Sequence, residues 1–179
     1  MPALGRNRKQ EEVRGDGDVM KILISGFEGN TNTSRIITEK IKSINISEKL
    51  YLINSFKSSV NQLEDMLQKH TFDLIIAFGQ KPKIKSICLE QKACVCGQEL
   101  VTDFEYKDLA DFLTNQGYQI EVSDNAGNYL CNNIFYAGLR YINNYCLNTR
   151  MIFIHIPTIE NMNNIDYLAE SFSQYVDRL

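Results

Sequence analysis

One cysteine lies where the chain passes from a strand into a helix, a position that suits a nucleophile. Cys131 falls in the stretch SDNAGNYLCNN, which leaves an apolar run at Val122 and enters a helical pattern near Tyr129. The free N–H groups and the positive end of the dipole at a helix start favour a thiolate over a thiol. We therefore expect Cys131 to be a nucleophile with a lowered thiol pKa. The alternative is a small residue that packs the helix start under the sheet.

A histidine at a strand end is the matching base. The chain has two histidines, and His70 ends a helical pattern, where it complements the helix dipole. His155 interrupts the apolar strand MIFIHIP near its carboxyl end, where a polar side chain needs a partner. Cysteine and histidine together form the nucleophile-and-base pair of acyl transfer. The alternative for His155 is a core histidine bonded to the backbone.

Glu90 is the candidate for the group that orients the imidazole and stabilises its cation. It follows the apolar residues of SICLE in a strand-like context. We expect its carboxylate to approach one ring nitrogen of His155, with the Cys131 sulfur within about 4 Å of the ring. The alternative is a surface glutamate on an edge strand.

The elements that must position these residues follow from the hydrophobic pattern. Apolar runs predict strands at 21–25, 50–53, 72–78, 118–122 and 151–156, with an extended segment at 83–95. Amphipathic stretches predict helices from residue 34, near 60–70, and at 106–115, 129–144 and 165–179. This alternation indicates an α/β domain with a mostly parallel sheet, whose ligands bind at the carboxyl ends of the strands. We therefore expect residues 26–29, 78–80, 123–131 and 155–157 at one active edge.

The composition is that of a globular domain. Hydrophobic residues make up 44% of the 179 residues, and 19 basic against 22 acidic side chains give a net charge of −3. This balance disfavours nucleic acid or an anionic membrane as a partner. The chain has no apolar run of about 18 residues and no apolar stretch of a signal peptide, so we expect a cytoplasmic protein. Residues 1–19 are polar and charge-balanced, which predicts a disordered leader or an appended extension before a domain at 20–179.

Two further motifs are poor matches to a phosphate-binding loop and to a cysteine-based metal or redox site. The turn GFEGN has the glycines of a phosphate loop, but it lacks the lysine, and Glu28 would repel a phosphate. The five cysteines are an odd number, which suggests reduced thiols rather than a disulfide framework. Cys94 and Cys96 form C-x-C without a second pair, so a zinc or thioredoxin-type site is weakly supported. We expect no metal.

Several of these segments resemble the pyroglutamyl peptidase I (pyrrolidone-carboxylate peptidase) family. Residues 123–132 (SDNAGNYLCN) resemble its cysteine signature, and Tyr136 fits one helical turn later. Residues 153–157 (FIHIP) resemble its histidine motif, and residues 20–28 (MKILISGFE) its first strand and turn. Leu89-Glu90 with Ala93 resembles the start of its glutamate motif, after a strand end at Gly79-Gln80. The resemblance runs from Met20 to the C-terminus in the family order Glu, Cys, His.

The resemblance implies a three-layer α/β/α sandwich and a cytoplasmic cysteine exopeptidase that removes N-terminal pyroglutamate from peptides. Cys131 would attack the pyroglutamyl carbonyl, His155 would take the thiol proton, and Glu90 would hold His155. Phe27, Gln80 and Leu130 would bind the substrate. The family uses no metal or organic cofactor, and its members often form dimers or tetramers.

Departures from the family pattern lie around the substrate and the oxyanion. The family continues its first turn as Pro-Phe-Gly-Gly, whereas here Glu28 is followed by GNTNTS, so a phenylalanine that stacks on the lactam ring is missing. No arginine stands between Glu90 and Cys131, where the family carries one near the oxyanion. These losses predict weak activity. One alternative is a non-catalytic binding or assembly protein on the same scaffold, and another is an unrelated α/β protein, such as a thiol redox module using Cys94 and Cys96.

Overall fold

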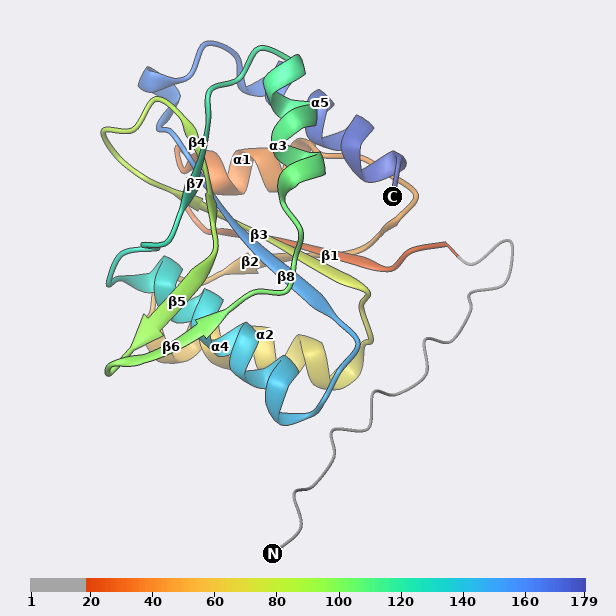
Figure 1. The fold of residues 1–179 in the computed structure, drawn as a ribbon, viewed down its shortest axis with the longest axis vertical. Coiled ribbons are helices and arrows are strands. Elements are labelled where there is room, and N and C mark those ends of the chain that lie inside the picture. Colours follow the sequence, from red (N-terminus) through yellow and green to blue (C-terminus); the bar gives the residue numbers. More distant parts are fainter. Residues whose placement is uncertain (1–18) are drawn as a thin grey trace, which may run out of the picture.

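The computed structural model describes residues 19–179, which form a sheet between two layers of helices (Figure 1). The leader expected at residues 1–19 lies outside the described residues except for Val19. The elements in chain order are β1 (Ile22–Phe27), α1 (Thr33–Lys40), β2 (Ile46–Leu52), α2 (Phe56–Lys69), β3 (Leu74–Gln80), β4 (Ile87–Glu90), β5 (Lys92–Val95), β6 (Gln98–Val101), α3 (Lys107–Asn115), β7 (Ile120–Ser123), α4 (Leu130–Asn144), β8 (Arg150–Ile156), the 3-10 turn η1 (Ile159–Asn161) and α5 (Ile165–Asp177). The predicted strands and helices are present with bounds that differ by a few residues, and β6 was not predicted.

The central sheet has six strands in the order β2-β1-β3-β8-β4-β7. Strands β1, β3 and β8 lie inside the sheet and are almost wholly buried, because their continuous apolar runs are covered on both faces. Helices α1, α3 and α5 cover one face, and α2 and α4 cover the other (Figure 1). Each helical layer buries its own apolar cluster against the sheet, so the predicted α/β/α sandwich is confirmed.

One pair of neighbouring strands, β4 and β8, is antiparallel, while β4 and β7 run parallel to each other. The carboxyl ends of β4 and β7 therefore point away from those of β3 and β8. The expectation that residues 123–131 share the carboxyl edge with 78–80 and 155–157 is wrong in this respect. Helix α4 instead approaches that region from the face of the sheet, because its N-terminal turn packs beneath β3.

The extended segment expected at 83–95 is two strands with different partners. β4 enters the central sheet, whereas β5 turns away and pairs with β6 as an antiparallel hairpin. The hairpin loop is Cys96-Gly97, and both residues have positive φ, 51° and 76°. Two consecutive positive φ values are the requirement of a type I′ turn, which glycine meets without strain. The hairpin packs against α4, next to the segment that carries Cys131.

The described part of the chain contains no helix that is both long and apolar enough to cross a membrane.

Candidate active site

Strand register brings Glu90 and His155 together in the interior. Cys88 lies opposite His155 and Glu90 lies opposite Phe153 in the β4–β8 pair, so all four side chains project from the same face of the sheet. Nδ1 of His155 is 2.6 Å from Oε1 of Glu90. The two residues are 3% and 0% exposed, respectively. The structure thus supplies the partner that a polar residue in the apolar strand β8 requires.

Glu90 is held as a carboxylate by its neighbours. Burial by itself raises its pKa, but the hydrogen bond with His155, the nearby Ser123 hydroxyl and the electrostatic interactions with His155 and Lys81 outweigh burial, so the pKa of Glu90 is lowered. Lys81 Nζ lies 3.6 Å from the same oxygen that contacts His155. The other oxygen, Oε2, is buried and makes no hydrogen bond to any residue in 19–179. The ionised carboxylate of Glu90 therefore lies directly beside Nδ1 of His155.

Cys131 lies in the first turn of α4, as predicted, and this helix start has no side-chain cap. The N-cap residues of helices α1, α2 and α5 are Asn32, Ser55 and Asn164, whose side chains accept backbone N–H groups. Tyr129, at the N-cap of α4, provides no such bond. The first N–H groups of α4 are consequently left without a side-chain acceptor, beside the thiol.

The Cys131 sulfur lies against Gly79 at the carboxyl end of β3. A Cβ placed on Gly79 would be 2.7 Å from the sulfur and 2.8 Å from the Phe153 ring, so this close approach requires glycine. Gly79 on β3 pairs with His155 on β8. Because the Cys131 sulfur lies against Gly79, the thiol is one strand away from the residue that carries the imidazole. No hydrogen bond links Cys131 to His155 in the portion of the chain that the structure describes. The structure therefore shows a Glu90–His155 pair with the thiol alongside.

The thiol pKa is shifted opposite to the sequence-based expectation. Burial, followed by the negative charge of Glu90, raises the pKa of Cys131 to about 12. The backbone N–H of Cys131 and the charge of Lys81 act in the lowering direction but do not prevail. The predicted lowered pKa is thus wrong, because the helix start is packed under the sheet and faces a carboxylate.

Phe27, Gln80 and Leu130, which the resemblance assigns to substrate binding, are buried or engaged in contacts within the fold. Phe27 and Leu130 are 3% and 5% exposed and belong to the apolar cluster on the α4 side of the sheet. Gln80 points to the other side, where its Oε1 accepts hydrogen bonds from the N–H and Oγ1 of Thr33 at 2.9 and 3.1 Å. In the structure Gln80 thus anchors the start of α1, and any role of these residues in binding remains a prediction.

Comparison with known proteins gives consistent relationships. The model of the pyroglutamyl peptidase family matches residues 100–174. The pyrrolidone-carboxylate peptidase of Brachyspira hyodysenteriae is 30% identical over 169 residues, which cover 78% of this chain and 84% of that protein. This chain belongs to the pyroglutamyl peptidase family. The pyrrolidone-carboxylate peptidase of Thermosipho melanesiensis is 26% identical over 172 residues, which cover 79% of this chain and 85% of that protein.

Solved structures of pyroglutamyl peptidases share the fold. Pyroglutamyl peptidase I of Bacillus amyloliquefaciens superposes with a TM-score of 0.79 at 21% identity, covering 88% of this chain and 95% of that one. The pyrrolidone carboxyl peptidase of Fervidobacterium islandicum gives a TM-score of 0.77 at 21% identity, covering 89% and 97%. The layers described above are therefore those of the pyroglutamyl peptidase fold.

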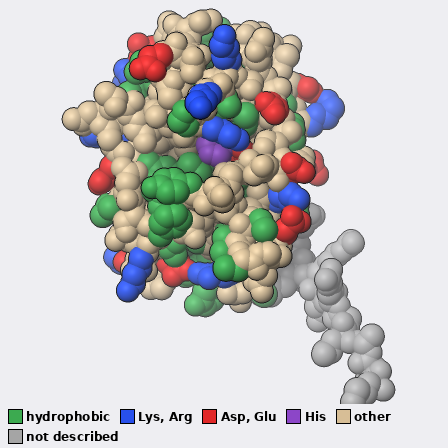
Figure 2. Space-filling view, turned by 90° about the vertical axis from the view of Figure 1, so that its left-hand side faces the viewer, with side chains coloured by type: hydrophobic (Ala, Val, Ile, Leu, Met, Phe, Trp, Pro, Cys, Tyr) green, Lys and Arg blue, Asp and Glu red, His purple; other side chains and the backbone are tan. Residues whose placement is uncertain are grey.

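Two features of this pyroglutamyl peptidase homologue escaped sequence reasoning. One is Lys81, because only the folded chain brings it to Glu90. The other is an aromatic pair in which the Phe56 and Tyr129 rings meet edge to face at 5.3 Å. These rings are 47% and 66% exposed, and Tyr129 precedes Cys131 by two residues. Figure 2 shows a face on which a histidine lies in a hollow, between basic side chains and a group of hydrophobic side chains.

Asn132 fixes the β5–β6 hairpin beside the cysteine. Its Oδ1 accepts from the Cys94 N–H at 2.9 Å, and its Nδ2 donates to the Cys94 carbonyl at 2.7 Å. One turn later the Tyr136 hydroxyl donates to Gln98 Oε1 at 2.9 Å. The cysteine signature therefore also docks the hairpin, and the exposed Cys94 is held by its backbone. Residues 19–179 contain no group of three or more side chains that could bind a metal ion.

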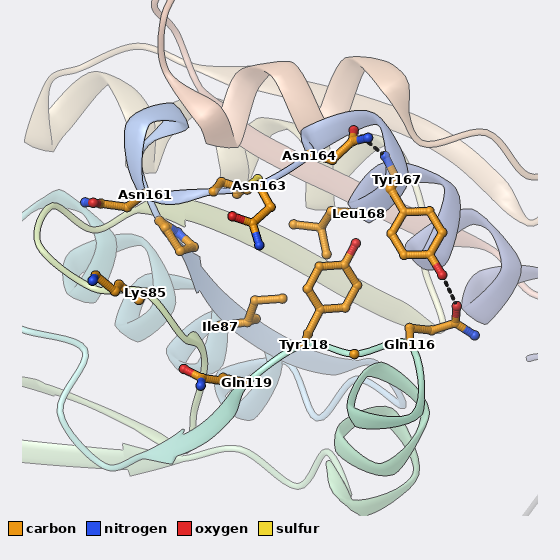
Figure 3. Close-up of a pocket in the computed structure, with 13 residues that line it drawn as sticks. Lys85, Ile87, Gln116, Tyr118, Gln119, Asn161, Asn163, Asn164, Tyr167 and Leu168 are labelled. Carbon is orange, nitrogen blue, oxygen red and sulfur yellow. Dashed lines mark hydrogen bonds between the residues drawn. The ribbon is translucent and has the colours of Figure 1, made fainter.

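A separate hollow of about 430 Å³ lies on the other face of the sheet (Figure 3). Ile87 and Leu168, which belong to the apolar cluster of that face, contribute to its lining. Tyr118 reaches into it, and at its rim the Tyr167 hydroxyl donates to Gln116 at 2.9 Å. Glu90, Cys131 and His155 are not part of its lining.

Proposed function

We propose that this protein is a cysteine exopeptidase that removes an N-terminal pyroglutamyl residue from peptides. The observation that carries the proposal is the buried Glu90–His155 pair next to the Cys131 thiol at an uncapped helix start, in a chain of this family. Cys131 is the nucleophile, His155 the general base and acid, and Glu90 the residue that holds the imidazole. We further propose that residues 20–179 form the catalytic domain and that the protein acts in the cytoplasm as a dimer or tetramer.

The proposed reaction follows from which imidazole nitrogen is available. Glu90 engages Nδ1, so Nε2 receives the thiol proton as the sulfur attacks the pyroglutamyl carbonyl carbon. The first N–H groups of α4 stabilise the negative oxygen that forms. Collapse of this intermediate breaks the C–N bond, and Nε2 returns the proton to the departing amine. Water then attacks the thioester carbonyl, with its hydroxyl bonding to the acyl carbon and its proton passing to Nε2. The C–S bond breaks, pyroglutamate is released, and Nε2 returns that proton to the sulfur.

The raised thiol pKa constrains when the thiolate forms. A thiol with a pKa of about 12 is protonated in the resting protein. We therefore propose that the proton moves to His155 during attack, when the imidazolium is stabilised by Glu90 and the developing charge by the helix start. This requires a substrate that draws the sulfur toward the ring, in agreement with catalytic contacts that tighten only in the complex.

We propose that the Phe56–Tyr129 pair provides the aromatic wall for the lactam ring. A small flat ring is recognised by apolar faces together with a few polar groups that pair its amide. Phe27 is buried in the core, whereas both rings of the pair are open to solvent near Cys131. Exposed aromatic side chains at two helix starts, Phe56 of α2 and Tyr129 at the N-cap of α4, are suited to stacking on such a ring.

A competition experiment tests this proposal. A pyroglutamyl aldehyde adds reversibly to an active-site thiol, so it should protect Cys131 from a thiol-reactive probe detected by mass spectrometry. The exposed Cys94 and Cys146 provide internal controls that should be labelled equally with and without the aldehyde. Protection restricted to Cys131, and absent with an aldehyde of unmodified glutamate, supports the proposal. Equal labelling of Cys131 in the presence of saturating aldehyde contradicts it.

The protonated, unbonded thiol also favours a second candidate function, a non-catalytic module that binds on this scaffold. Its distinguishing result is binding of a pyroglutamyl peptide, measured by calorimetry, to wild type and Cys131→Ala alike and without release of product. The exopeptidase predicts instead that the wild-type protein consumes the peptide during titration.

A further inference from the structure

We propose that Lys81 is a positioning residue that compensates the charge of Glu90, so that the Cys131 thiol can pass its proton to His155. This inference rests on the proposed function, because it assigns a role within the same site. Lys81 acts through Glu90 rather than on the substrate.

The backbone fixes Lys81 at the strand end beside the site. It directly follows β3, and its N–H donates to the Ile156 carbonyl at 2.9 Å, which ties it to the residue after His155. Its Nζ lies 3.6 Å from Glu90 Oε1. The Lys81 side chain is 35% exposed while that of Glu90 is 0% exposed, so the ammonium reaches from the surface to a carboxylate that solvent does not reach.

Glu90 Oε1 is shared between the imidazole of His155 and the ammonium of Lys81. His155 Nδ1 is 2.6 Å from this oxygen, and Lys81 Nζ approaches the same atom. His155 and Lys81 are the ion-pair partners that Glu90 has within residues 19–179. A buried carboxylate with a neutral imidazole as its remaining partner would be an uncompensated charge, which is costly in the interior. Lys81 supplies the positive charge that balances it.

The charge balance decides how readily the thiol ionises. With Lys81 present, Glu90 and Lys81 sum to zero, and proton transfer adds a thiolate and an imidazolium that also sum to zero. Without Lys81, the site carries a net negative charge both before and after the proton moves from Cys131 to His155. The thiolate then forms close to the uncompensated carboxylate of Glu90. The negative charge of Glu90 raises the pKa of the Cys131 thiol, and the positive charge of Lys81 lowers it. Glu90 is needed to hold the imidazole but opposes the thiolate, and Lys81 offsets that opposition.

The other charged groups that face the site do not replace Lys81. On β7, Glu121 contacts Ser86 at 3.2 Å and Cys88 at 3.9 Å, and it adds negative charge. Burial raises the pKa of the Cys88 thiol, which is therefore neutral. Lys83 and Lys85 belong to the same loop as Lys81, but neither pairs with Glu90 among the described residues. Lys83 therefore offers a matched control with the same charge and loop.

The test measures alkylation of Cys131 by iodoacetamide as a function of pH, resolved by mass spectrometry, in Lys81→Met, Lys83→Met and Lys81→Arg. Since the thiolate is the reactive form, we expect Lys81→Met to slow alkylation at a fixed pH by about tenfold, the effect of one pKa unit. Lys81→Arg should restore most of the wild-type rate, and Lys83→Met should leave it unchanged. Thermal unfolding of each variant shows whether the fold is retained.

Each outcome has a defined meaning. Equal slowing in Lys81→Met and Lys83→Met, or no slowing in either, overturns the role of Lys81. Slowing in Lys81→Met that Lys81→Arg fails to restore also overturns it, because the positive charge would then not be the cause. The measurement does not need peptidase turnover. An unchanged alkylation profile in a chain that cleaves pyroglutamyl amides rejects this inference alone, whereas absent turnover with a shifted profile rejects the proposed function alone.

Discussion

Nδ1 of His155 lies 2.6 Å from Oε1 of Glu90, and the antiparallel register of β4 against β8 sets this distance. Both side chains leave the sheet on the side of α4, where Cys131 lies. The imidazole is thus oriented by the framework of the fold, before any substrate is present.

Replacing Glu90 by glutamine should reduce turnover much more than binding. The amide keeps the shape and can still accept from Nδ1, but it cannot stabilise the imidazolium. We expect kcat to fall by about 10⁴-fold, the loss that a carboxylate-to-amide change causes in a serine protease triad. Glu121→Gln is the control, because Glu121 lies on the same face and contacts Cys88 instead of His155. Similar losses in both variants would assign the effect to general charge rather than to orientation.

Glu90 should also contribute to stability in a pH-dependent way. Its pKa is lower in the folded state, so its contribution is complete above the unfolded value near 4.5 and is lost as the pH falls through the folded value. We expect the free energy of unfolding in urea to fall more steeply with acid in wild type than in Glu90→Gln. Parallel curves for the two proteins below pH 4.5 would contradict the lowered pKa.

Gly79→Ala should displace the thiol. The added Cβ would be 2.7 Å from the Cys131 sulfur and 2.8 Å from the Phe153 ring, so both must move. We expect a loss of about 1–3 kcal/mol in stability from overpacking and about 10²-fold in turnover from misplacement. Adding Cys131→Ala to Gly79→Ala should recover part of the stability, because the sulfur is then gone. Strict additivity of the two changes would show that the contact is not formed.

Asn132→Ala should release the β5–β6 hairpin from α4. The change leaves the N–H and C=O of Cys94 without their partner, at a cost of about 1–3 kcal/mol. Hydrogen exchange should then accelerate at residues 92–101 more than in β1 or β3. Asn133→Ala provides the neighbouring control, since Asn133 makes a single long contact of 3.5 Å to Phe56. Equal exchange in the two variants would argue against docking by Asn132.

The sequence predicted those features of the structure that depend on a single strand or helix. Strands β1, β3 and β8 are continuous apolar runs that form buried central strands irrespective of their neighbours. The start of α4 follows from the turn residues before Cys131, and this placed the cysteine at a helix N-terminus. The pairing of Glu90 with His155 was anticipated because each is a polar residue among the apolar residues of a strand-like segment, and each therefore requires a partner.

Features that depend on contacts between two distant segments could not be predicted from the sequence. The direction of β4 is set by its packing between β8 and β7, and no local pattern encodes it. The raised thiol pKa depends on burial of Cys131 and on the charge of Glu90, neither of which the helix start reveals. The contact of Lys81 with Glu90 likewise joins a loop to a buried strand.

The most direct test of the account is hydrolysis of a fluorogenic pyroglutamyl amide by the purified chain under reducing conditions. We predict turnover that disappears in Cys131→Ala and persists in Cys94→Ala and Cys146→Ala. The missing phenylalanine and arginine should keep kcat/KM below about 10⁵ M⁻¹s⁻¹, within the lower part of the enzyme range. A higher value would show that groups such as the Phe56–Tyr129 pair replace the missing ones fully. Absence of turnover, together with a Cys131 thiol that a pyroglutamyl aldehyde does not protect, would contradict the proposed exopeptidase.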